Sequence, residues 1–171
     1  MNIYPIVVIT EEMIKNAKEL IEGSRVHRTI ASPIDTLTGH LGEFVFAEYY
    51  FGNWQLNNVG KNKGQSDFKD IEVKASAFPF SERLNLLVRE DYAKKRKPDY
   101  YVQIIIDVSK AWIKDIEPNT KAYVCGWATA EEVDKAPLRD MGSKYGGRGG
   151  YRCHYINIKN LNAIHKLKEM L

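Results

Sequence analysis

Residues 66–76 read Ser66-Asp67-Phe68-Lys69-Asp70-Ile71-Glu72-Val73-Lys74-Ala75-Ser76, and this stretch carries the clearest structural signal in the chain. Along a β-strand, side chains two positions apart share a face. Glu72 and Lys74 therefore project together, whereas the apolar residues between them face the opposite way. Lys69-Asp70 predicts a turn, which would bring Asp67 beside Glu72. The pattern predicts a strand with a charged face and an acid held next to it.

The charged face fits the chemistry of a metal site. Two neighbouring carboxylates repel each other, which raises a pKa unless a cation lies between them. Mg²⁺ prefers hard oxygen ligands and retains water. Lys74, placed beside the ion, can orient a water for in-line attack on phosphorus. The alternative is a surface strand pair in which Asp67, Glu72 and Lys74 form exposed salt bridges, each worth only about 0.2–1 kcal/mol.

A helix is expected immediately upstream, from about Thr36 to Phe51, with Gly52 as its end. Its apolar residues lie on most sides, which predicts a well-buried helix. Glu43 stands within this apolar sequence, where an unpaired carboxylate would be costly. A metal site gives Glu43 a role, and the alternative is a glutamate on the helix surface. His40, one turn earlier, is either a further site residue or a solvent-facing histidine.

The rest of the chain alternates between strand-like and helix-like segments, which predicts a mixed α/β domain. The run at 100–108 is nearly continuous and apolar, as expected of a central strand covered on both faces. Gln103 within it is either a site residue or a buried, hydrogen-bonded glutamine. Other strands are expected at 6–9, 54–56, 66–68, 84–88, 122–127 and 151–158, helices at 10–23, 89–97, from 129 and at 161–171, and loops at 24–35, 60–64 and 142–150.

Composition sets the broad class. A chain of 171 residues, 44% apolar and 27% charged, is expected to form one domain with a sizeable core. Its apolar runs are too short to cross a bilayer, and its first residues lack the pattern of a secretion signal, so no membrane partner is expected. Cys125 and Cys153 have neither disulfide nor zinc-site spacing. Lone thiols fit a reducing compartment, so we expect a cytoplasmic protein.

The net charge of +3 is only mildly basic, but the basic residues are clustered at 25–28, 61–69, 94–97 and 144–152. Such clusters can neutralise phosphates, although each can also be an ordinary solvated surface. The last cluster mixes basic, aromatic and glycine residues, which suits a nucleic-acid-contacting loop or a plain hairpin connection. Ser76 continues the face of Glu72 and Lys74. The candidate nucleic-acid contacts are Arg25, Arg28, Ser76, Lys144 and Arg148.

The motifs also resemble those of a known enzyme family. Gly64-Gln65-Ser66-Asp67-Phe68 followed by Ile71–Ser76 resembles motifs II and III of the PD-(D/E)XK nucleases, with Ser66 where that family has proline. Leu41–Ala47 resembles the first core helix of the family, which supplies a glutamate to the metal site. The family core runs helix, strand, strand, strand, helix, strand, and the elements expected within residues 36–108 follow that order.

The resemblance implies a restriction-endonuclease-like core, a mixed central sheet flanked by helices, in one nuclease domain over 1–171 with a C-terminal extension from 109. Glu43, Asp67, Glu72 and the carbonyl of Val73 would bind Mg²⁺ or Mn²⁺, and Lys74 would position the water. The implied activity is metal-dependent hydrolysis of phosphodiester bonds, mostly in duplex DNA, where double-strand cutting favours a homodimer. Two alternatives stay open, namely a non-catalytic nucleic-acid-binding or assembly protein with this fold, and a structural α/β domain.

Overall fold

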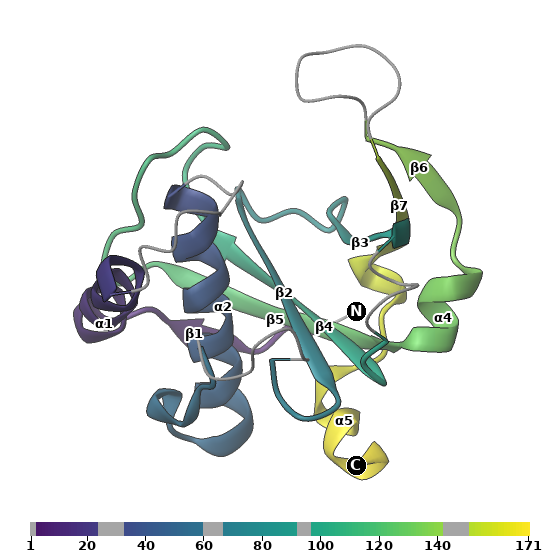
Figure 1. Ribbon diagram of the computed structural model, residues 1–171, viewed down its shortest axis with the longest axis horizontal. Helices are drawn as coiled ribbons and strands as arrows, with labels where there is room; N and C mark the ends of the chain where they lie inside the picture. Colours follow the sequence, from purple (N-terminus) through teal and green to yellow (C-terminus); the bar gives the residue numbers. More distant parts are fainter. Residues whose placement is uncertain (1–2, 24–32, 60–66, 92–96, 142–150) are drawn as a thin grey trace.

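The computed structural model describes residues 3–23, 33–59, 67–91, 97–141 and 151–171, and Figure 1 shows their arrangement. They form two β-sheets with helices packed around them. The larger sheet has the strand order β1 (Ile6–Val8), β5 (Lys121–Thr129), β4 (Tyr100–Asp107), β2 (Ile71–Phe78). The smaller sheet has the order β3 (Asn85–Arg89), β7 (Arg152–Asn157), β6 (Leu138–Asp140).

The larger sheet is mixed, because β2 and β4 are parallel while β4–β5 and β1–β5 are antiparallel. Its centre is β4, where the residues from Tyr101 to Ile106 are buried on both faces, as the apolar run predicted. In Figure 1, α1 and α2 lie to the left of β2, and the smaller sheet with α4 lies to its right. The fold is therefore mixed α/β, with a mixed four-stranded sheet flanked by helices.

Two N-terminal helices cover one face of the larger sheet. α1 (Glu11–Gly23) begins after Thr10, whose Oγ1 accepts a hydrogen bond from the amide of Met13 at 3.2 Å. α2 (Pro33–Phe51) starts three residues earlier than expected, so the predicted loop is wrong at 33–35, and residues 24–32 lie outside the described part of the chain. Proline suits the first turn of a helix, where its missing N–H leaves no bond unmade.

Two local predictions fail because capping and tertiary bonds override propensity. Residues Trp54–Leu56 form a short 3-10 helix rather than a strand, because Asn53 Oδ1 accepts a hydrogen bond from the Gln55 amide at 3.0 Å. Residues 67 and 68 do not form a strand either. Phe68 makes a single antiparallel bridge with Ile71 around the predicted turn at 69–70.

The expected C-terminal helix over 161–171 is wrong at its start, and the chain is helical only from Ile164 to Met170. Asn162 exchanges backbone hydrogen bonds with Trp127 of β5, at 3.0 and 2.8 Å, which holds the chain extended there. Gly126 has φ of 147°, and a Cβ at this position would lie 2.6 Å from the Asn162 carbonyl oxygen, so the crossing requires glycine. Helical turns resume only afterwards, in a 3-10 turn at Ile164–Lys166 and in α5 (Leu167–Met170).

The remaining elements follow the sequence more closely. α4 (Ala130–Lys135) has the capping box of Thr129 and Glu132. β6 was not expected. Of the helix predicted at 89–97, residues 90 and 91 are helical, Arg89 ends β3, residue 97 is not helical, and 92–96 lie outside the described ranges. The predicted loops at 60–64 and 142–150 lie outside them as well. In the part of the chain that is described, no helix is long and apolar enough to cross a membrane.

The order expected for residues 36–108 is reproduced only in part. The first strand is replaced by the 3-10 helix, and β3 leaves the larger sheet to pair with β7. β5, from the region beyond residue 108, instead completes the larger sheet beside β4. A restriction-endonuclease-like core therefore stays a prediction.

Candidate active site

The candidate site lies at the outer edge of β2. The carbonyl of Asp70 accepts a hydrogen bond from the Tyr100 amide at 3.0 Å, and that of Phe78 accepts one from the Val108 amide at 3.3 Å. Backbone groups alternate in direction along a strand, so the even-numbered residues of β2 bond to β4. The N–H and C=O of Val73 consequently face the outer edge. Asp67 lies there, since its Oδ2 accepts a hydrogen bond from the Val73 amide at 2.8 Å.

α2 brings Glu43 to the same place. Gly42 lies so close to β2 that a Cβ added to it would collide with the Cβ of Ala75. The absence of a side chain at Gly42 therefore permits the close approach of helix and strand. Glu43, the next residue along α2, is near enough to Asp67 and Glu72 for their charges to act on it.

The carboxyl group of Glu43 is poorly compensated. It is half-buried, and its Oε1 is a buried atom with no hydrogen-bond partner among the described residues. Burial first, and then the negative charges of Asp67 and Glu72, raise the pKa of Glu43 to about 9. Without a cation nearby, this side chain therefore holds its proton at neutral pH.

The pKa of Asp67 is raised by some of its neighbours and lowered by others. Burial and the charge of Glu72 raise its pKa to about 7, against the lowering effects of the Val73 amide and of Lys74. Glu43, Asp67, Glu72 and Lys74 thus form one electrostatic group contributed by α2, the turn before β2, and β2 itself. The charges of Asp67 and Glu72 disfavour the anion of Glu43, and the charge of Glu72 disfavours the anion of Asp67.

The smaller sheet covers the face of β2 and β4 that carries Glu72 and Lys74. Leu86 and Val88 of β3 pack with Tyr101 of β4 in one apolar cluster. Burial and then the charge of Glu72 raise the pKa of Tyr101 to about 12, and Asp134 adds to this. Tyr101 lies opposite Glu72 in the strand register. Tyr101 is thus a neighbour of the site that sequence reasoning missed, because nothing local in the run of 100–108 marks it.

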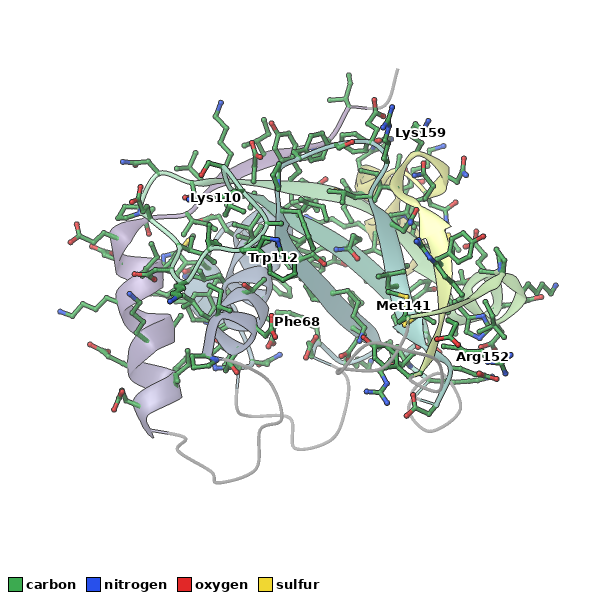
Figure 2. The ribbon with its side chains drawn as sticks, turned by 90° about the horizontal axis from the view of Figure 1, so that it is seen from above. Phe68, Lys110, Trp112, Met141, Arg152 and Lys159 are labelled. Carbon is green, nitrogen blue, oxygen red and sulfur yellow. The ribbon has the colours of Figure 1, made fainter. Side chains whose placement is uncertain are left out.

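Lys74 is also close to the smaller sheet. Burial raises the pKa of the Cys153 thiol on β7, while the positive charges of Arg89 and then Lys74 oppose that rise. The charged face of β2 therefore lies between α2 at the sheet edge and the smaller sheet across the face. Figure 2 shows this arrangement from above, with Phe68 on the α2 side and Met141 and Arg152 on the side of the smaller sheet.

The donors present fit a hard divalent cation in kind. Three carboxylates, one with an unpartnered buried oxygen, and the outward-facing carbonyl of Val73 are the oxygen ligands that Mg²⁺ and Mn²⁺ take. In the described ranges, however, no three His, Cys, Asp or Glu side chains are already arranged to hold an ion. The metal site therefore stays a prediction.

The other predicted site residues have different surroundings. Ser76 is half-buried and lines a cleft beside β2. Gln103 is buried, and its Nε2 donates to the Ile104 carbonyl at 2.9 Å, which agrees with the structural interpretation. His40 is half-buried, and burial lowers its pKa. Arg25, Arg28, Lys144 and Arg148 lie outside the described residues.

Comparison of the chain with family models, curated proteins and solved structures finds no match in any of the three. The resemblance to PD-(D/E)XK nucleases consequently rests on the motif residues alone.

Proposed function

We propose that this protein is a metal-dependent nuclease that hydrolyses phosphodiester bonds, most readily in DNA. The observation that carries the proposal is the group formed by Glu43, Asp67 and Glu72. A buried carboxylate oxygen without a partner, with two further acids close by, is costly for a folded protein. A divalent cation bound among them would offset that cost. Lys74, on the same face of β2 as Glu72, would then hold a water beside that ion.

Each residue of the group has a role in the proposed reaction. Glu43, Asp67 and Glu72 would hold the ion, with the Val73 carbonyl as a further ligand. When bound, Mg²⁺ or Mn²⁺ supplies a water of lowered pKa and stabilises the charge on the departing oxygen. Lys74 would hold the attacking water in line with the phosphorus. The Val73 amide fixes Asp67 at the strand edge through the 2.8 Å bond, so this ligand is positioned before the ion binds.

The fold supports the proposal without requiring it. A parallel β2–β4 pair, with α2 packed against β2 and the acid–acid–lysine set at the outer edge, is what a restriction-endonuclease-like core would need. The first strand of that core is replaced here by a 3-10 helix, so the proposed relationship is to the central part of such a core. A homodimer would follow if the protein cuts both strands of a duplex.

The test is a cleavage assay with purified protein. Supercoiled plasmid, linear duplex, single-stranded DNA and RNA are incubated with Mg²⁺, with Mn²⁺, or with a chelator. Cleavage that requires the divalent ion is the expected result. Binding of nucleic acid without cleavage under every condition would instead favour the non-catalytic binding protein, and neither activity would favour a structural domain.

A further inference from the structure

A cleft lies along the C-terminal half of β2. It has a volume of about 680 Å³ and is lined by the first turns of α2, by residues 75–78 of β2 and by residues 111–114 of the loop after β4. The cleft begins at Ala75 and Ser76, directly after Lys74 in the strand, so it is next to the candidate site along β2.

Trp112 stands at the wall of this cleft with 91% of its surface exposed. In Figure 2 it lies near the middle of the face seen from above, on the α2 side of β2. The other tryptophans differ, because Trp127 is only 5% exposed and Trp54 packs against Phe44 with ring centroids 5.2 Å apart. Trp112 thus presents its ring to solvent.

The loop that carries Trp112 is anchored beneath it. Ile113 packs against the main core and Ile116 is buried. Ala111 and Ile113 are half-buried and alternate with Lys110, Trp112 and Lys114, which are exposed. The anchored backbone therefore holds Trp112 at the surface, where its ring is open to a flat ligand.

Two lysines beside Trp112 are able to contact phosphates. Lys110 and Lys114 flank Trp112 and line a common surface hollow with it, which the carboxylates Asp107, Asp115 and Glu117 line as well. Neither lysine forms an ion pair within the described ranges. The nearest acid in sequence, Asp115, is held by Lys18 at 3.1 Å, and Asp107 accepts a hydrogen bond from the Phe80 amide at 2.8 Å. Among the described residues, Asp35 is the one carboxylate lining the cleft itself, in the first turn of α2.

We propose that the Lys110–Lys114 loop binds an unpaired nucleic-acid strand, with one base stacked on Trp112 and its neighbouring phosphates contacted by Lys110 and Lys114. This inference rests on the proposed function for its class of ligand. Bases inside a duplex are already stacked on both faces, whereas an unpaired base has a face to offer to an aromatic side chain. The substrate is accordingly a single strand, or a duplex with an unpaired segment beside the cleaved bond.

Binding to labelled oligonucleotides tests the inference in a Lys74→Ala background, which keeps the ligand intact. The probes are a single-stranded DNA, the same sequence as RNA, a blunt duplex, and that duplex with a single-stranded overhang. Base–aromatic stacking is worth about 1–3 kcal/mol, so Trp112→Ala should weaken single-strand and overhang binding by roughly 5- to 150-fold. Blunt-duplex binding should change by less than about 3-fold, and Trp112→Phe should retain most of the affinity.

Tryptophan fluorescence supplies a second readout. Single strands should quench the emission of the parent protein, and most of this quenching should disappear in Trp112→Phe, because Trp127 is buried and Trp54 is half-buried against Phe44. Unchanged single-strand affinity in Trp112→Ala, or quenching of equal size in Trp112→Phe, would overturn the inference. The better-bound single strand identifies DNA or RNA as the ligand.

The outcomes separate this inference from the nuclease proposal. If the wild type cuts nucleic acid and Trp112→Ala binds single strands as well as its parent, the nuclease proposal stands and the stacking inference is wrong. If Trp112-dependent binding is found without any cleavage, the stacking inference stands and the nuclease proposal is wrong. If no oligonucleotide binds, both are wrong.

Discussion

The surroundings of Glu43 decide whether its side chain is protonated. In the protein without metal, folding raises the pKa of Glu43 from 4.5 to about 9, through burial and then the charges of Asp67 and Glu72. The folded chain thus binds more protons than the unfolded chain within that pH range, so the free energy of unfolding falls as pH rises through it. Asp67 adds an effect of the same sign up to about pH 7.

Thermal melts in chelator should accordingly show a midpoint that decreases between about pH 5 and pH 9. Glu43→Gln keeps the shape of the side chain and removes its titration, so its midpoint should depend less on pH. Glu12→Gln, on the exposed side of α1, serves as the control and should follow the wild type. Parallel curves for Glu43→Gln and wild type would show that Glu43 is not in the electrostatic group described here.

A change at Lys74 should affect the cleavage rate much more than the binding of nucleic acid. Lys74→Ala removes one half-buried charge and no part of the apolar core, so the fold should persist. If Lys74 orients the attacking water, the cleavage rate should fall by about 100-fold or more, the scale seen when one preorganised electrostatic group is lost. Binding should fall much less, because phosphate affinity is shared among several basic residues. Lys121→Ala, an exposed change on β5, is the control. Equal cleavage rates for Lys74→Ala and wild type would disprove this mechanism.

At the scale of elements, the position of Glu43 depends on how closely α2 approaches β2. Gly42→Ala places a Cβ against that of Ala75, so helix and strand must separate. We expect a loss of about 1–3 kcal/mol in stability, with a loss of activity as Glu43 moves from its neighbours. The double variant Gly42→Ala/Ala75→Gly removes the collision and should recover much of the stability. Denaturant unfolding measures both.

The same helix offers a matched control. Gly39 has open space where its Cβ would be, so Gly39→Ala should be neutral or stabilising by up to about 1 kcal/mol through helix propensity alone. A destabilisation of Gly39→Ala equal to that of Gly42→Ala would mean that the cost comes from the helix and not from its packing on β2.

Some secondary-structure elements could be predicted from the sequence, and others could not. The central strand, α1 and the start of a helix at 129 follow from periodicity and caps, which are local signals. The turn at 69–70 and the common face of Glu72 and Lys74 follow from strand alternation. The 3-10 helix at 54–56 and the extended segment at Asn162 do not, because they depend on the Asn53 cap and on bonds to Trp127.

At the scale of the whole molecule, the sequence did not show which distant segments pair in one sheet. β3 and β7 are more than sixty residues apart in the chain and pair in one sheet, as the partners Leu86 and Ile156 show. That sheet covers the face carrying Glu72 and Lys74, so the enclosure of the candidate site depends on the C-terminal part of the chain. No motif in residues 66–76 reveals this cover, and it also explains why Tyr101 was missed.

A divalent ion is expected to stabilise the whole folded chain. An ion that binds only the folded chain raises its stability by about 2.7 kcal/mol at a hundred times its Kd. For a chain of this size, each kcal/mol moves the melting midpoint by roughly 2–4 °C, so millimolar Mg²⁺ or Mn²⁺ should raise it by about 5–11 °C if it is well above its Kd. The rise should be largest at high pH, where the protein without metal is weakest.

The controls for the divalent ion make that melt decisive. Potassium chloride at matched ionic strength should not reproduce the shift, because screening alone supplies no cation between Glu43, Asp67 and Glu72. Glu43→Gln should be stabilised less by the ion than wild type, since the variant has lost one of the carboxylate ligands. A wild-type midpoint unchanged by both Mg²⁺ and Mn²⁺ would count against the metal site and against hydrolysis at it, whereas the stacking of an unpaired base on Trp112 would remain to be judged by its own binding assay.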